Sequence, residues 1–166
     1  MDAILDDRPM TDREAITDQL YRYCRAMDRI DAELGHSIWH DDGTADYGPG
    51  RFSGNGRAFV DHVCAQHAGL LAHSHQVTNV IIELDRDRAA SESCCIATLR
   101  MMRGDVLTQI MVWSRYIDSW SKRAGRWALD HRLAVIDFDE IRAVTVMSQS
   151  SPGRRDRTDP SYGVLK

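Results

Sequence analysis

The sequence predicts an α+β fold in which three N-terminal helices pack on a strongly curved, mainly antiparallel sheet. Apolar residues recur at helical spacing up to about residue 70, and four strand-like runs follow as far as about residue 139. Short polar turns join these runs, so neighbouring strands are expected to be antiparallel. A chain of 166 residues suits one domain with one core.

The first helix is expected to begin at Thr11, because Thr11 and Glu14 have the spacing of a capping box. We expect Asp31 and Gly35 to interrupt this helix. The apolar positions of this helix are Ile16, Leu20, Tyr23, Met27 and Ile30. A short helix with the apolar residues Leu34, Ile38 and Trp39 is expected next.

Extended chain is expected around residues 45–47, and glycines bracket a short strand at residues 51–53. A third helix follows. The residues that trace this helix are Phe59, His62, Val63, Gln66 and Leu70.

The sheet is expected to be strongly curved, because two of its strands exceed the usual strand length and need bends or bulges. The four runs are His75 to Leu84, Ala89 to Met102, Val106 to Trp120 and Arg126 to Phe138. A curved sheet closed by helices forms a cone with a pocket inside. We expect this domain to span residues 10–147, after a flexible N-terminus at residues 1–9. The polar tail at residues 148–166 favours disorder or packing on a neighbouring subunit.

Composition restricts the class of protein. A net charge of -4 and a pI of about 5.9 argue against a nucleic-acid partner, because such proteins usually need a positive surface. The sequence starts without the pattern of a signal peptide, and no apolar run approaches the roughly 20 residues that span a bilayer. We therefore expect no membrane partner and a cytoplasmic location. The four cysteines have no CxxC spacing and are interpreted as buried thiols.

Asp28 and His75 are the candidate catalytic residues. Imidazole starts with a pKa near neutral pH, and a carboxylate bonded to one ring nitrogen leaves the other nitrogen free to remove a proton. The residues alone leave alternatives open. His75 fits a hydrogen-bonded core histidine, and Asp28 fits a solvent-facing residue or the cap of the next helix.

The order of elements resembles the SnoaL-like branch of the nuclear transport factor 2-like superfamily over roughly residues 10 to 140. The matching residues are Tyr23 and Asp28 on the first helix, Tyr47 on the first strand, and His75 with Asp85 on a later one. Segments at residues 115–118, 125–127 and 131–132 are also typical of the family. Within it, the chain is most similar to the group of scytalone dehydratase, bile acid 7α-dehydratase and hexachlorocyclohexane dehydrochlorinase.

This resemblance implies a cone that eliminates water or HCl without metal or cofactor, with His75 as the base and Asp28 as its partner. It also implies tyrosines in the pocket, matched by Tyr23 and Tyr47. On an unbroken helix, Tyr23 and Asp28 point about 140° apart, so both reach one pocket only if the helix loosens near Met27. Bile acid dehydratase carries a further carboxylate on the fourth strand, and counting from the histidine places Thr98 at that position in this chain. A different substrate or a different reaction therefore stays open. The related enzymes suggest a trimer rather than a dimer, and apolar residues on both strand faces indicate a homo-oligomer.

Other polar residues have simpler interpretations. Arg132 fits either an anionic substrate or an ion pair with Asp118 or Asp130, and we favour the pair. His36 and His40 have i, i+4 spacing but lack the HExxH pattern of a metal site, so a solvated helix face is favoured over a metal. The arginines of the tail are interpreted as solvated charge.

The sequence therefore predicts a cofactor-independent lyase of the dehydratase type, or an isomerase, acting on a small hydrophobic cyclic molecule. Steroid-like, polyketide-like and aromatic compounds fit this description. Tyr23, Tyr47, Thr98 and Arg132 are the candidate substrate-binding residues. The alternatives are a non-catalytic small subunit of an aromatic-ring-hydroxylating dioxygenase, which shares the fold and size, and a small-molecule binding protein.

Overall fold

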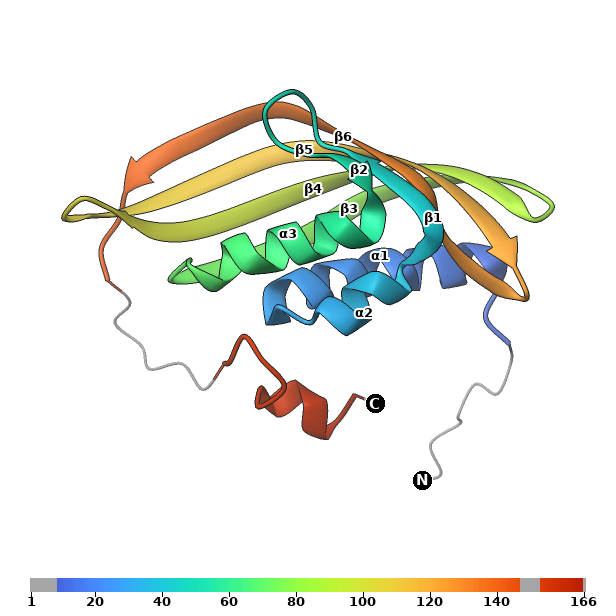
Figure 1. The fold of residues 1–166 in the computed structure, drawn as a ribbon, viewed down its shortest axis with the longest axis horizontal. Helices are drawn as coiled ribbons and strands as arrows, with labels where there is room; N and C mark the ends of the chain where they lie inside the picture. The colour runs from blue at the N-terminus through green and yellow to red at the C-terminus, as the bar shows by residue number, and fades with distance from the viewer. Residues whose placement is uncertain (1–8, 147–152, 166) are drawn as a thin grey trace.

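A computed structural model of the chain describes residues 9–146 and 153–165, and it has the predicted α+β architecture (Figure 1). Three helices cover the concave side of one curved, six-stranded sheet. The helices are α1 (Asp12–Arg29), α2 (Ala32–Ser37) and α3 (Gly56–Ala68), and a short 3-10 helix, η1 (Pro160–Gly163), follows near the C-terminus. The strands are β1 (Trp39–Asp46), β2 (Ser53–Asn55), β3 (Ala72–Asp85), β4 (Arg88–Arg103), β5 (Val106–Arg123) and β6 (Arg126–Ala143).

The sheet order is β2-β1-β6-β5-β4-β3, so the last four strands form a meander and β1 joins its far edge. Among the strands of the described residues, only the β1 and β6 pair is parallel. The predicted irregularities are present, because the register shifts once between β3 and β4 and twice between β5 and β6. Such shifts increase local twist and bend long strands, which lets the sheet curve around the helices.

The first helix is regular as far as Arg29 and has a defined start and end. Thr11 and Glu14 form the predicted capping box, and Ile30 adopts a left-handed conformation that closes α1. Asp31 then caps α2 by accepting a hydrogen bond from the Leu34 N–H at 3.1 Å. The expectation that Gly35 interrupts a helix was wrong, because Gly35 lies inside α2 at a close helix contact. A Cβ there would lie 2.6 Å from a Val60 methyl.

Two details of the predicted helices need correction. Trp39 opens β1 and does not belong to the second helix. The buried face of α3 is also different, since His62 and Gln66 are exposed. The buried side chains of α3 are Phe59, Val60, Cys64 and His67. This rotation of the helix brings His67 to the inner side, next to β3.

The core lies between the helices and the concave face of the sheet. The largest fully buried apolar side chains are Trp39, Trp120, Tyr23, Ile16, Leu20, Met27, Ile38 and Leu129. No helix in the described part of the chain is long and apolar enough to cross a bilayer.

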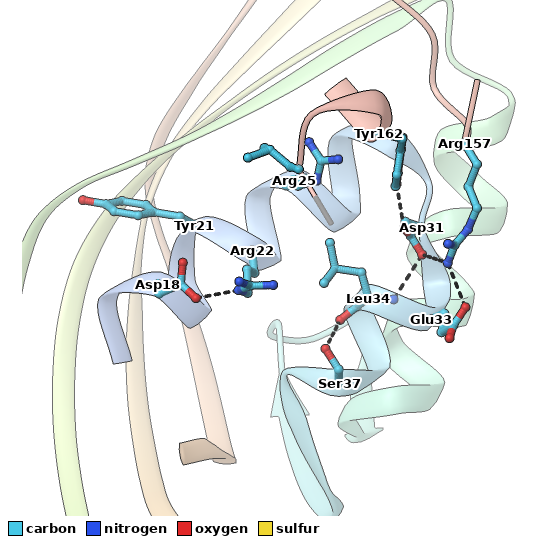
Figure 2. A pocket seen from close by; sticks show the side chains of 11 residues that line it. Asp18, Tyr21, Arg22, Arg25, Asp31, Glu33, Leu34, Ser37, Arg157 and Tyr162 are labelled. Carbon is cyan, nitrogen blue, oxygen red and sulfur yellow. Dashed lines mark hydrogen bonds and ion pairs between the residues drawn. The ribbon is translucent and has the colours of Figure 1, made fainter. Parts of the chain in front are cut away.

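The C-terminal segment, residues 153–165, packs on the helices of its own chain. This corrects the expectation of disorder or of packing on a neighbouring subunit. The Tyr162 hydroxyl donates to Asp31 at 2.6 Å, and Arg157 bridges Asp31 and Glu33 (Figure 2). Arg25 also donates to Ser161 at 2.9 Å. A hollow of about 640 Å³ lies between this segment, α1 and α2. Of the expected flexible N-terminus at residues 1–9, residues 1–8 lie outside the described part of the chain.

Candidate active site

Asp28 and His75 lie together in the structure. Asp28 is in the last turn of α1 and His75 is near the start of β3, and the carboxylate Oδ1 lies 2.8 Å from the imidazole Nδ1. The same carboxylate accepts the backbone N–H of His75 at 2.9 and 3.1 Å. The side chains are only 16% and 8% exposed. Two kinds of hydrogen bond therefore hold the carboxylate against the imidazole.

This geometry determines the tautomer of His75. A carboxylate can only accept, so the Nδ1 of His75 carries the proton and the Nε2 carries a lone pair. Among the residues that the structure describes, no hydrogen-bond partner faces Nε2. Nε2 is therefore the nitrogen that can take a proton from a bound molecule.

Two further histidines, His67 and His73, lie beside the pair, and sequence reasoning did not include His67 among the candidate site residues. His73 donates from Nε2 to the Met27 carbonyl oxygen at 2.9 Å. The ring of His67 lies 4.4 Å from that of His73 and 5.4 Å from that of His75, measured between centroids. Burial, with help from the other two imidazoles, lowers the pKa of His67 to about 3, so His67 is neutral at physiological pH. The spacing of Val60, Cys64 and His67 was the signal for this buried position.

A second polar group lies deeper in the fold, around Arg132. Its guanidinium binds Asp118 through two hydrogen bonds of 2.8 Å, and both side chains are fully buried. Burial opposes its charge, but Asp118 outweighs this effect and raises the pKa of Arg132 well above its ordinary value. The guanidinium also lies over the rings of Tyr116 and Tyr23, at 3.9 and 4.4 Å from their centroids. Its Nη1 is buried without a hydrogen-bond partner in the described structure.

Tyr23 and Tyr47 belong to this deeper group. Their hydroxyls lie 2.9 Å apart, and the ring of Tyr47 stacks on Phe59. Burial raises the pKa of Tyr47 to about 12 and that of Tyr23 well above its usual value. Both phenols therefore remain protonated hydrogen-bond donors. Tyr23 reaches this group while α1 stays helical to Arg29, so the helix does not loosen near Met27.

Strand register shows which side chains separate the two groups. His75 pairs with Ala97, which pairs with Val112, so these three share the inner face. The next inner row contains Val77, Cys95 and Ser114, and the following row contains Tyr116. The inner face between His75 and the arginine group is therefore largely apolar.

Thr98 does not belong to this face, which corrects its place among the candidate substrate-binding residues. Thr98 pairs with Ser74, the neighbour of His75, and adjacent residues of a strand point to opposite sides. Its side chain is therefore directed away from the helices that cover His75.

The remaining histidine candidates lie on different elements. His36 on α2 contacts Asp61 at 2.8 Å, and His40 on β1 is buried with its Nε2 3.0 Å from the Ser121 carbonyl oxygen. The interpretation of His40 as part of a solvated helix face was therefore wrong. Within the described ranges, no three His, Cys, Asp or Glu residues are grouped so that they could hold a metal ion.

Comparison with known proteins identifies the family. Residues 8–133 match the SnoaL-like domain. The chain belongs to the SnoaL-like family. The solved structures similar to this SnoaL-like protein agree with the nuclear transport factor 2-like cone. No curated protein matches the sequence significantly.

Three solved structures illustrate the similarity of the fold. A hexachlorocyclohexane dehydrochlorinase from Novosphingobium barchaimii has a TM-score of 0.72 at 17% identity, covering 83% of this chain and 94% of its own. A protein from Novosphingobium aromaticivorans, provisionally described as a scytalone dehydratase, has a TM-score of 0.68 at 19% identity, covering 84% and 95%. The Kfla4162 protein of Kribbella flavida has a TM-score of 0.71 at 20% identity, covering 78% and 93%. At these identities the similarity shows the fold alone.

Proposed function

We propose that this SnoaL-like protein is a lyase of the dehydratase type, or an isomerase, in which His75 removes a proton from carbon. The observation that carries the proposal is the 2.8 Å contact between His75 Nδ1 and Asp28, which leaves Nε2 as the basic nitrogen. A general base is effective when its pKa lies near the working pH, and imidazole meets this condition without a cofactor.

The elimination would proceed with defined proton and bond changes. Nε2 of His75 takes the proton, the C–H electron pair forms the new double bond, and the C–O bond breaks. The leaving hydroxyl takes up the proton that His75 now carries and departs as water, so the imidazole returns to its neutral form. Asp28 stabilises the positive charge on the imidazole during this step. Tyr23, Tyr47 and Arg132 supply the donors that a carbonyl or leaving hydroxyl needs, and the unpartnered Nη1 of Arg132 is one of them.

The substrate we propose is a small hydrophobic cyclic molecule, either steroid-like, polyketide-like or aromatic. The inner face between His75 and Arg132 carries Val77, Cys95 and Ala97 and has few polar groups. An apolar ring would contact this face while its oxygen faces the tyrosines and Arg132. The names of the similar structures, a dehydrochlorinase and a dehydratase, describe eliminations and support the same reaction class.

The test is a screen of hydroxylated cyclic compounds for loss of water, followed by variants assayed on any substrate that is converted. His75→Ala and Asp28→Asn should each lower kcat by about 10²-fold to 10⁴-fold, because each removes part of the base. His62→Ala is a matched control, since His62 is exposed on α3. Full activity in either dyad variant would refute the mechanism. Tight binding of the compounds without any product would instead favour a binding protein.

We also propose that the convex face of the sheet joins copies of this chain, with a trimer as the expected state. Ile81, Ile117 and Leu133 lie in one row of paired residues on that face, with Glu92 between Ile81 and Ile117, and are 63%, 39% and 36% exposed. Phe138, which is 57% exposed, stacks on Trp113 nearby. Apolar side chains gathered in this way favour burial against a partner. Sedimentation analysis tests this proposal, and a monomer at micromolar concentration would contradict it.

A further inference from the structure

The C-terminal segment brings Arg155 to the histidines beside the candidate base. Arg155 donates from Nη1 to the His67 carbonyl oxygen at 2.8 Å and from Nη2 to the Leu70 carbonyl oxygen at 2.7 Å. Both carbonyls lie at the C-terminal end of α3, where the helix dipole favours a positive charge. The Nη1 of Arg155 also lies 3.4 Å from Nδ1 of His73. One side chain of the tail therefore contacts both α3 and the start of β3.

The contact with Arg155 restricts the protonation of His73. A guanidinium can only donate, so the Nδ1 of His73 that faces it must be the acceptor. The proton of His73 then lies on Nε2, which donates to the Met27 carbonyl oxygen at 2.9 Å. Met27 directly precedes Asp28 on α1. A continuous set of hydrogen bonds thus joins Arg155, through His73, to the backbone that carries Asp28.

We propose that Arg155 is a positioning residue for the Asp28 and His75 pair, acting through neutral His73 and the end of α3. This proposal deepens the proposed function, because its effect on turnover rests on His75 being the base. Its effect on His73 is a property of the protein alone and can be measured without any substrate.

The charges around the cluster give the reason for such a residue. Three imidazoles lie with ring centroids within 6.1 Å of one another, and only that of His75 contacts a carboxylate. The charged groups that face the cluster are Asp28 from α1 and Arg155 from the tail. Burial lowers the pKa of His73, and the positive charge of Arg155 acts in the same direction. The lowered pKa values of His67 and His73 favour the neutral form of both imidazoles.

Arg157 provides a matched control within the same segment. It binds Asp31 and Glu33 on the outer side of the helices, shown in Figure 2, and its side chain is 63% exposed. Loss of Arg157 weakens docking of the tail but leaves the charge beside His73 in place. Loss of Arg155 removes that charge. The two variants therefore separate docking from positioning.

The first experiment is an NMR titration of the histidine ring protons in the full chain, for the wild type, Arg155→Gln, Arg155→Lys and Arg157→Gln. We expect the midpoint of His73 to move to higher pH in Arg155→Gln, because a nearby positive charge is gone. Arg155→Lys keeps a cation and should move the midpoint less, and Arg157→Gln should leave it in place. Equal His73 midpoints in the wild type and in a folded Arg155→Gln variant would overturn the proposal. If Arg155→Gln does not fold, Arg155→Lys is compared with Arg157→Gln. The proposal would then be overturned by a His73 midpoint in Arg155→Lys that is equal to or lower than the midpoint in Arg157→Gln.

The second experiment measures turnover of any substrate found in the screen. Arg155→Gln should lower kcat/KM by about 10-fold to 100-fold and alter its pH profile, since small displacements of catalytic groups cost this much. Arg157→Gln should stay within about twofold of the wild type. Equal losses in the two variants would show that the tail only stabilises the fold, and would refute positioning. If the wild-type protein turns over no compound, the proposed function fails while the titration still decides the role of Arg155.

Discussion

Replacing Asp118 with Asn should destabilise the fold strongly, because Arg132 would remain charged and buried without a counter-charge. Two hydrogen bonds of 2.8 Å join the side chains, and neither is exposed to solvent. For charge centres about 4 Å apart at an effective dielectric constant of about 20, the attraction is about 4 kcal/mol. Removing one partner of a buried pair typically costs about 3–5 kcal/mol. For a chain of this length, that corresponds to a fall in Tm of about 6 to 20 °C.

Urea and thermal unfolding, followed by tryptophan fluorescence and circular dichroism, measure this loss. The control is Asp137→Asn, which removes a carboxylate from an exposed pair with Arg115 at 3.0 Å. Exposed pairs contribute little, so the control should lose less than about 1 kcal/mol. If Asp118→Asn lost no more than Asp137→Asn, the reasoning that Asp118 neutralises Arg132 would be refuted. A double variant with Asp118→Leu and Arg132→Met should be more stable than Asp118→Asn, because no unpaired charge is buried.

Two further predictions concern His67 and Gly56. His67→Gln should flatten the pH dependence of unfolding, because the pKa of His67 is about 3 in the folded protein and about 6.5 when unfolded. Between these values the unfolded chain binds more protons than the folded protein, so the wild type loses stability as pH falls. The free energy of unfolding in urea, measured from pH 7 to pH 4, tests this. The same dependence on pH in the wild type and in His67→Gln would contradict it. Gly56→Ala should cost about 1–3 kcal/mol, because the new Cβ would lie 2.1 Å from the buried Trp39 ring. Unaltered thermal unfolding would show that the ring moves away freely.

Helical and strand periodicity was sufficient for the order of elements, but it did not determine which face of α3 is buried. Two sets of residues have helical spacing in this segment. One is His62, Val63 and Gln66, and the other is Cys64 and His67. The structure buries the second series because α3 packs against β1 and α2, and because the ring of His67 lies against those of His73 and His75 on β3. A short helix with few large apolar residues has no single preferred face. The elements that pack against the helix determine which face is buried, and these elements are distant in sequence.

Thr98 shows how a count along the chain fails within a sheet. The family resemblance placed it near the base, but a shift of one residue moves a side chain to the opposite face. Hydrogen bonding between β3 and β4 sets the register, and it pairs His75 with Ala97. The Asp28 and His75 pair was predicted from the family resemblance, because the residues alone also fitted a core histidine and a helix cap. The structure places the two side chains 2.8 Å apart.

The C-terminal segment was the largest structural error, and its cause is physical. A segment rich in charge, proline and glycine cannot form a core of its own, so composition predicts disorder. Docking here depends instead on polar contacts with atoms that helix formation has already positioned. Asp31 caps α2 and also accepts from Tyr162, while Arg155 donates to the His67 and Leu70 carbonyl oxygens at the C-terminal end of α3. These acceptors exist only once the helices have formed. Whether a polar tail becomes ordered therefore depends on the helix ends that it meets.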